Sequence, residues 1–403
     1  GSTASTDPGH HAIASRSFAG LRLPEPMQPV DGCVRFGSSD DHHAGWKDGS
    51  LLPSTAGPDA VTGDAVLLRT EPVSPAALLA LESASKKFVR PIDAAQRIAN
   101  LFGGDYDTEV THAVDCVSLE IREREVVGLV GESGCGKSTV GRMLVGLLQP
   151  SDGRVLSQGR DLAKLDRSEL KQESLRVQMI FQDPFSSLNP RMRVRDIIGQ
   201  APRIHRIVNK AGIDAYVDEV LDRIGLDPTF KQRYPHQLSG GQRQRVCIAR
   251  ALAVQPRALV CDEAVAALDV SIQAQILNLF MELRESLALT LLFISHDLGV
   301  VEHMSDRIVV MYLGRVVETA TTEQMFHYPN HPYTRALLTE VPNIRLRRKR
   351  YVAIQGEIPS PMHPPPGCHF HPRCAQAMPR CRVEKPELRE VAAGHFSACH
   401  LND

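Results

Sequence analysis

The chain combines 403 residues with a formal net charge of −1 and a hydrophobic share of 42%. Charged residues make up a further 23%, an ordinary value for a soluble globular protein. This length suits one large α/β domain with appendages. The near-neutral charge gives no electrostatic footprint of a nucleic-acid partner, so we expect none. The longest apolar stretches, such as residues 287–294, are far shorter than the roughly 20 residues that span a bilayer.

The N-terminal part of the chain differs in composition from the rest. Residues 1–76 are rich in Gly, Ser, Pro, Asp and His and show no sustained helical or strand period, so we expect a disordered or weakly ordered extension. Residues 78–83 then indicate an edge strand, and residues 113–121 alternate like a half-buried strand. The apolar run at 125–130 is typical of a buried parallel strand, and a helix is predicted over 137–148.

Helices and strands alternate through the middle of the chain. Residues 191–250 are mainly helical by pattern, and apolar strands at 258–262 and 290–295 flank a helix at 272–287. This order predicts a largely parallel sheet covered on both faces. From residue 330 onward the chain is rich in Pro, His and Arg, which indicates an appendage.

The sequence GESGCGKS at residues 131–138 lies between a predicted strand and a predicted helix, the context of a phosphate-binding loop (P-loop). Gly131, Gly134 and Gly136 allow the backbone N–H groups to point at phosphate oxygens, and the helix that follows adds its positive end. We expect Lys137 to reach the β- and γ-phosphates of a nucleotide and the Ser138 hydroxyl to coordinate Mg²⁺. The same ATP-binding segment includes Ser133, Cys135 and Thr139.

An acidic pair ends the predicted strand at 258–262. Asp262 suits Mg²⁺, directly or through water, and the adjacent Glu263 suits polarising the water that attacks a phosphate. Acidic pairs at strand ends are common by chance. The position of this one, after the helix that begins near residue 240, favours the catalytic interpretation.

A second motif, LSGGQ at residues 238–242, accompanies the P-loop, and together they resemble the ATP-binding subunits of ABC transporters. The resemblance covers residues from about 78 to 403. It implies an ABC-type nucleotide-binding domain at 77–328, built from a RecA-like parallel sheet, an antiparallel β subdomain and a helical subdomain at about 190–250. Residues 329–403 would form a C-terminal extension.

The resemblance also assigns roles to single residues. Gln182 would sense Mg²⁺ and the γ-phosphate, His296 would contact the γ-phosphate, and Phe88 would stack on adenine. Asp269 matches the D-loop. The signature residues would bind the γ-phosphate of an ATP held by an opposing domain: Ser239, Gly240, Gly241 and Gln242. Two domains would then close on two ATP molecules, so we expect an isolated monomer to hydrolyse ATP slowly.

Two positions depart from the pattern of the family. Ala264 and Ala266 stand where its members usually have Pro and Ser. Neither position supplies the catalytic carboxylate, so we still expect a competent site.

Further segments resemble oligopeptide/dipeptide importers: FQDPFSSLNPR at 181–191, LDVSIQAQ at 268–275, HPYT at 331–334 and GEIPSP at 356–361. The sequence of residues 269–273 is more similar to the second of the two ATPase subunits that these importers use. The resemblance therefore implies a different ATPase chain as partner in a heterodimer, two integral membrane permease subunits and an external substrate-binding protein. The chain would be peripheral, on the cytoplasmic face of the bacterial plasma (inner) membrane.

Other functions stay open at this point. Nickel, glutathione, opine and some sugar importers share these features. A soluble ABC ATPase of DNA repair or translation is a second class, and stable association with membrane proteins would separate it from an importer. A third class is a regulatory or metal-sensing protein that uses ATP as a switch.

Four cysteines near the C-terminus, Cys368, Cys374, Cys381 and Cys399, are spaced C-x5-C-x6-C-x17-C. This is not the spacing of a zinc ribbon, but four thiolates can hold a [4Fe–4S] cluster or Zn²⁺. The segment around Cys368 resembles the C-terminal region of peptide importer ATPases, in which such cysteines can ligate an iron–sulfur cluster. Zinc and metal-free thiols are the alternatives.

Overall fold

The computed structural model describes residues 77–92, 96, 100, 107–339, 354 and 356–403. All of them belong to one structural unit of the chain. The predicted N-terminal extension, residues 1–76, lies outside the described residues.

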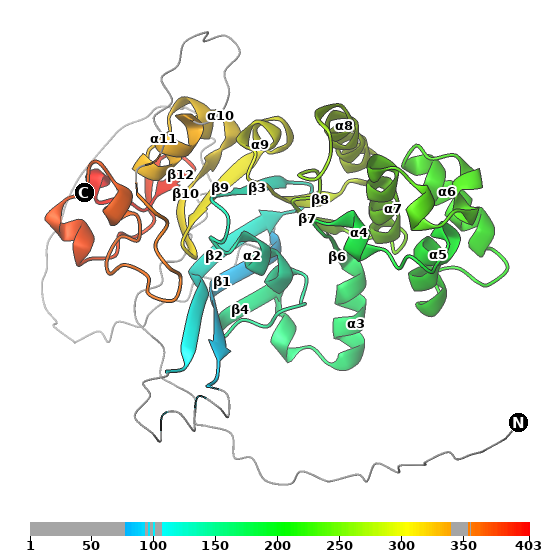
Figure 1. Cartoon of the computed structure of the whole chain (residues 1–403), viewed down its shortest axis with the longest axis horizontal. Coiled ribbons are helices and arrows are strands. Elements are labelled where there is room, and N and C mark those ends of the chain that lie inside the picture. Colours follow the sequence, from blue (N-terminus) through cyan, green and yellow to red (C-terminus); the bar gives the residue numbers. More distant parts are fainter. Residues whose placement is uncertain (1–76, 93–95, 97–99, 101–106, 340–353, 355) are drawn as a thin grey trace, which may run out of the picture. The chain divides into compact units, whose positions relative to one another are not determined.

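A mixed sheet forms the centre of this unit (Figure 1). Among the described residues it has eight strands in the order β11-β12-β10-β9-β3-β8-β7-β6. The five strands from β9 to β6 run parallel, which confirms the predicted parallel sheet, and β10, β12 and β11 add antiparallel pairs at one side. The parallel strands are β3 (Val126–Val130), β6 (Val177–Ile180), β7 (Ala258–Asp262), β8 (Thr290–Ile294) and β9 (Arg307–Tyr312).

Both faces of the parallel strands are buried because their apolar side chains point alternately to two separate cores. Val126 and Val130 of β3 pack into one core, whereas Val127 and Leu129 pack into the other. Strand β8 divides in the same way, with Phe293 in the first core. Burying a strand on both sides requires an apolar side chain at nearly every position, which explains the short continuous apolar runs of the sequence.

Helices and a second sheet cover the two faces. On one side, the second core includes α2 (Lys137–Leu144) and a four-stranded antiparallel sheet in the order β2-β1-β4-β5. On the other side, the first core includes α7 (Gly240–Leu252), α8 (Val270–Leu287) and α9 (Leu298–Met304). The strands of the second sheet are β1 (Ala77–Arg90), β2 (Glu109–Arg122), β4 (Asp152–Ser157) and β5 (Arg160–Asp161).

Two sequence predictions of local structure were wrong. The segment 78–83 was expected at a sheet edge, but β1 pairs with β2 on one side and β4 on the other. Its residues 77–81 are all buried, as expected for an interior strand, and its partner β4 lies some 70 positions away in sequence, beyond any local signal. The helix expected over 137–148 ends at Leu144, because Gly146 adopts a positive φ of 74° that breaks it.

Helices between β6 and β7 lie beyond β6, at the opposite end of the sheet from the C-terminal strands (Figure 1). The region at 191–250 that was predicted to be mainly helical contains α5 (Val194–Ile204), α6 (Ile213–Arg223) and most of α7. The other elements of this region and of the segment before it are η1 (Leu162–Lys164), α3 (Arg167–Arg176), α4 (Pro184–Ser187), η2 (Pro228–Gln232) and η3 (Pro235–Gln237).

The C-terminal part of the chain returns to the main sheet. Strand β12 pairs antiparallel with β10, so the last strands extend the sheet beyond β9 (Figure 1). None of the described helices combines the length and apolar character needed to span a membrane. The remaining elements are β10 (Arg315–Thr321), α10 (Thr322–His327), α11 (Pro332–Thr339), η4 (His371–Arg373), η5 (Pro379–Arg382), β11 (Arg389–Ala392), β12 (His395–Ser397) and η6 (His400–Asn402).

Candidate nucleotide site

The sheet topology brings most of the predicted catalytic residues to one edge. Strands β3, β8, β7 and β6 are neighbours and run parallel, so their carboxyl ends meet at the same edge. The P-loop follows β3, His296 follows β8, and Gln182 follows β6. Asp262 is the last residue of β7, and Glu263 comes directly after it. This edge is the position at which open α/β sheets bind their ligands.

Two glycines of the P-loop are required by close backbone contacts. A Cβ atom on Gly131 would lie 2.2 Å from the carbonyl oxygen of Met311, and one on Gly136 would lie 2.2 Å from that of Ala113. Their φ angles, 150° and 104°, are also ones that L-residues rarely adopt. Gly134, at φ 80°, has open space beside it. The loop is therefore wrapped tightly against its surroundings at both ends and open at its middle, where Ser133 and Gly134 are exposed.

Lys137 folds back over the P-loop. Its ammonium donates to the carbonyl oxygen of Gly131 at 2.7 Å and to that of Glu132 at 3.0 Å, and the side chain is almost fully buried. A buried ammonium needs such partners. Phosphate oxygens can replace these carbonyls as acceptors, so Lys137 is placed to exchange loop contacts for nucleotide contacts. Thr139 lies half-buried in the first turn of α2, and Cys135 is buried below the loop.

Ser138 and Asp262 provide two oxygen ligands of the kind that Mg²⁺ prefers. The Ser138 hydroxyl donates to Oδ1 of Asp262 at 2.8 Å. Asp262 is buried, and burial raises the pKa of its carboxyl group although the Ser138 hydrogen bond acts in the opposite direction. A divalent cation would relieve this cost, so the pair fits the metal ion that accompanies a nucleotide.

Glu263 is contacted by both of the other predicted catalytic residues. The Gln182 side chain donates from Nε2 to Oε2 of Glu263 at 2.6 Å, and Nδ1 of His296 lies 3.5 Å from Oε1. The amide nitrogen of Gln182 is thereby engaged, which leaves its carbonyl oxygen as the atom available to a metal ion. Glu263 also has a φ of 48°, an uncommon angle for a residue with a Cβ that is enriched at functional sites.

The signature residues form the start of α7 and lie apart from the P-loop contacts. Ser239 caps the helix: its hydroxyl accepts the N–H of Gln242, whose side chain accepts the N–H of Ser239 in return. Gly241 packs so closely on α8 that a Cβ there would lie 2.5 Å from Cγ2 of Ile272. Ser239 and Asp269 are exposed, as residues that serve an opposing domain would have to be.

Phe88 lies near the end of β1 and is 42% exposed, with the Lys86 ammonium 5.6 Å from the centre of its ring. An exposed ring is free to stack on a base. The structure describes no contact that joins Phe88 to the P-loop, so its adenine-stacking role stays a prediction.

The four C-terminal cysteines are neighbours, but they do not form a metal site in the described structure. Burial, together with the three other cysteines of the motif, raises the pKa of the Cys368 thiol to about 11. No group of three or more His, Cys, Asp or Glu residues within the described ranges could hold a metal ion. The predicted cluster or zinc site is therefore not confirmed, because the arrangement lacks a converging set of ligands.

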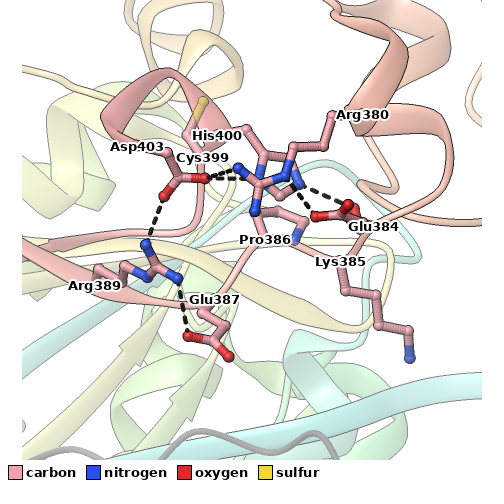
Figure 2. Close-up of a pocket in the computed structure, with 9 residues that line it drawn as sticks. All are labelled: Arg380, Glu384, Lys385, Pro386, Glu387, Arg389, Cys399, His400 and Asp403. Carbon is pink, nitrogen blue, oxygen red and sulfur yellow. Dashed lines mark hydrogen bonds and ion pairs between the residues drawn. The ribbon is translucent and has the colours of Figure 1, made fainter.

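One of these cysteines, Cys399, lines a pocket of about 280 Å³ in the C-terminal segment (Figure 2). The Asp403 carboxylate lies between two arginines there and accepts from Arg380 and Arg389 at 2.6 Å each. Arg380 also pairs with Glu384. The two arginines of this pocket thus already have carboxylate partners within the same segment.

Sequence reasoning missed one set of contacts at the P-loop. The Arg373 guanidinium forms two hydrogen bonds with the Glu132 carboxylate, and the Tyr333 hydroxyl accepts the Glu132 N–H. Arg373 is 241 positions from Glu132, so no local pattern could have paired them. The acidic residue within the glycine-rich loop was the only available signal, because a carboxylate beside bound phosphates needs a cationic neighbour.

Two family models match the chain. The model described as ABC transporter matches residues 114–266, which include the P-loop, Gln182, the signature motif and Glu263. The model described as oligopeptide/dipeptide transporter, C-terminal region, matches residues 317–381, which include Tyr333 and Arg373.

Curated and solved proteins show the same similarity. The chain is 49% identical over 293 residues to the oligopeptide transport ATP-binding protein AppF of Bacillus subtilis, an alignment that covers 72% of this chain and 89% of the relative. It is 46% identical over 326 residues to the probable peptide ABC transporter ATP-binding protein y4tS of Sinorhizobium fredii, covering 81% and 90%. A solved structure of the ATP-binding cassette MJ0796, bound to ADP and Pi, aligns at a TM-score of 0.52 and 27% identity over 60% of this chain and 98% of that one.

Proposed function

Because the chain belongs to the ABC transporter family, among the ATP-binding proteins of peptide transporters, we propose that it hydrolyses ATP to power the import of di- and oligopeptides. The observation that carries the proposal is the identity of nearly half of all aligned residues to an oligopeptide transport ATP-binding protein, over most of that protein's length. The match to the C-terminal region of oligopeptide/dipeptide transporters supports peptides over nickel, glutathione, opines or sugars as cargo.

ATP is held mainly by the P-loop in this proposal. Backbone N–H groups between Gly134 and Ser138 surround the phosphates, and Lys137 leaves the carbonyls of Gly131 and Glu132 to neutralise the β- and γ-phosphates. Ser138 and Asp262, with Gln182, would hold Mg²⁺. When bound, the metal ion would neutralise the negative charge that develops on the transferred phosphoryl group.

Hydrolysis uses the carboxylate at the end of β7. Glu263 accepts a proton from the attacking water, and the water oxygen bonds to the γ-phosphorus. The bond between the γ-phosphorus and the oxygen that bridges it to the β-phosphate breaks, which releases ADP and phosphate. Gln182 fixes one carboxylate oxygen of Glu263 by the 2.6 Å hydrogen bond. His296, exposed and 3.5 Å from the other carboxylate oxygen, is placed to contact the γ-phosphate.

The site needs a second chain for its completion. Ser239, Gly240, Gly241 and Gln242 would bind the γ-phosphate on the opposing domain, and Asp269 would lie at the same interface. The exposure of Ser239 and Asp269 supports this arrangement. We infer a heterodimer with a related ATPase subunit, bound to two permease subunits on the cytoplasmic face of the bacterial plasma membrane and served by an external substrate-binding protein.

A metal site at Cys368, Cys374, Cys381 and Cys399 stays a separate prediction. The described arrangement does not fit a cluster or zinc ion, so no step of hydrolysis depends on one. Iron and zinc analysis of protein purified without oxygen tests it: stoichiometric iron or zinc supports a site, and the lack of both excludes it.

The proposed function is tested with the complex that co-purifies with this chain from its native membrane. ATP hydrolysis is measured with added binding protein, with and without a mixed peptide pool, and the matched control is the complex carrying Glu263→Gln. Stimulation by peptides that is absent from the control supports the proposal. Membrane partners without a peptide response would replace peptides by nickel, glutathione, opines or sugars, and a lack of membrane partners would overturn the importer.

A further inference from the structure

The C-terminal segment contacts the P-loop directly, at Glu132. Arg373 donates from Nη1 to Oε2 of Glu132 at 2.6 Å and from Nη2 to Oε1 at 3.0 Å. The hydroxyl of Tyr333, on α11, accepts the backbone N–H of Glu132 at 2.9 Å. A bidentate pair fixes the plane of the carboxylate as well as its position. One residue of the P-loop is therefore held both by its side chain and by its backbone.

The groups that hold Glu132 are themselves rigid. The Arg373 side chain is 5% exposed, and Tyr333 is fully buried. Tyr333, Tyr312 and Phe370 pack against one another with ring centres 4.7–5.3 Å apart. Hydrogen bonds to Glu132 raise the pKa of the Arg373 guanidinium further above its usual range, so its positive charge is permanent. The ion pair is therefore buried within the fold. It differs from an exposed ion pair, which contributes little to stability.

These contacts determine what Glu132 can offer a nucleotide. Its N–H donates to Tyr333 and is not free for a phosphate, and its carbonyl oxygen is one of the two that receive the Lys137 ammonium. Its carboxylate would repel bound phosphates and attract Lys137 if it were not neutralised. Arg373 supplies that neutralisation from the side of the loop that faces the C-terminal segment.

We propose that Arg373 and Tyr333 are positioning residues that clamp Glu132 and hold the P-loop in the conformation that accepts ATP. The C-terminal segment is thereby part of the nucleotide site. This assignment concerns ATP binding by the chain and does not depend on which cargo the transporter carries.

The test compares variants of the full-length chain by their dissociation constant for a fluorescent ATP analogue and by their unfolding midpoint without nucleotide. Arg373→Ala leaves the Glu132 carboxylate without its partner, and we expect about tenfold weaker binding. Glu132→Gln breaks the same contact from the other side and leaves the buried Arg373 without its counter-charge, so it should also weaken binding severalfold. The double variant should bind about as weakly as Arg373→Ala alone, because both substitutions break the same contact and their effects do not add.

A matched control comes from the same segment. Arg389→Ala breaks the ion pair with Asp403, which joins two residues of the C-terminal segment and does not reach the P-loop (Figure 2). This variant should bind the ATP analogue as wild type does. Equal weakening in Arg389→Ala and Arg373→Ala would show a general loss of structure and would overturn the clamp.

Two further outcomes decide the proposal. Wild-type affinity in a folded Arg373→Ala protein would overturn it, and so would a double variant in which the two single losses of affinity multiply, since Arg373 and Glu132 would then act independently. If Arg373→Ala fails to fold, Tyr333→Phe takes its place: it removes one hydroxyl, keeps the buried ring and leaves the Glu132 N–H without its acceptor. A severalfold weaker affinity at an unchanged unfolding midpoint supports the clamp, and unchanged affinity refutes it.

Discussion

Two buried histidines of the C-terminal half should make the fold sensitive to mild acid. His331 and His369 are almost fully buried, and burial is the main reason that the pKa of each imidazole falls from its usual value of 6.5 to about 4. Nδ1 of His331 accepts the N–H of Tyr333 at 3.1 Å, a contact that requires the neutral ring. Nδ1 of His369 lies 3.0 Å from the carbonyl oxygen of Leu313, which fixes the position of the neutral ring.

The direction of the effect follows from proton linkage. Between pH 6.5 and pH 4 the unfolded chain binds protons at these positions and the folded chain does not, so the free energy of unfolding falls as the pH falls. The stability that depends on the two neutral histidines is fully present above pH 6.5. At pH 5 the loss is about 2 kcal/mol for each histidine, or about 4 kcal/mol for both.

Urea unfolding at pH 7.5 and pH 5 measures this loss. His331→Asn and His369→Asn keep a polar atom near the position of Nδ1 but cannot be protonated, so each variant should lose about 2 kcal/mol less than wild type between the two pH values. Glu318 does not interfere in this range: burial alone would raise the pKa of its carboxyl group, but hydrogen bonds from His395 and Thr334 lower it below its ordinary value of 4.5. A variant that loses as much stability as wild type would refute the assignment to that histidine.

Two other predictions concern the nucleotide site. Glu263→Gln should bind ATP, lose turnover by two orders of magnitude or more and stall in a closed complex, as measured by ATP hydrolysis and by size-exclusion chromatography with ATP; retained turnover would remove Glu263 from the role of base. Gly136→Ala should lower the free energy of unfolding by about 1–3 kcal/mol more than Gly134→Ala, because only at Gly136 does the new Cβ meet a backbone oxygen, at 2.2 Å. Equal urea midpoints for the two alanine variants would contradict the close approach to Ala113.

Much of the nucleotide site could be predicted because each motif is tied to the end of a strand. The apolar runs before Gly131, Glu263 and His296 each form a buried parallel strand, and parallel neighbours bring their ends together without further information. The position of β1 could not be predicted, because an interior strand of an antiparallel sheet differs from an edge strand only by a partner from elsewhere in the chain. The pairing of Arg373 with Glu132 could not be predicted for the same reason, because it depends on where the C-terminal segment returns to the sheet.

The contact between Gly241 and Ile272 has a mechanical consequence. A Cβ atom on Gly241 would lie 2.5 Å from Cγ2 of Ile272, so the beginning of α7 packs directly against the first turn of α8 and leaves no room for a larger side chain. If the signature segment contacts an opposing nucleotide as proposed, we expect it to move together with the segment that begins at Asp269. A short linker of six residues, 263–268, connects the latter segment to the end of β7. In the proposed dimer, we expect a displacement at the partner's ATP to reach Glu263 through this linker.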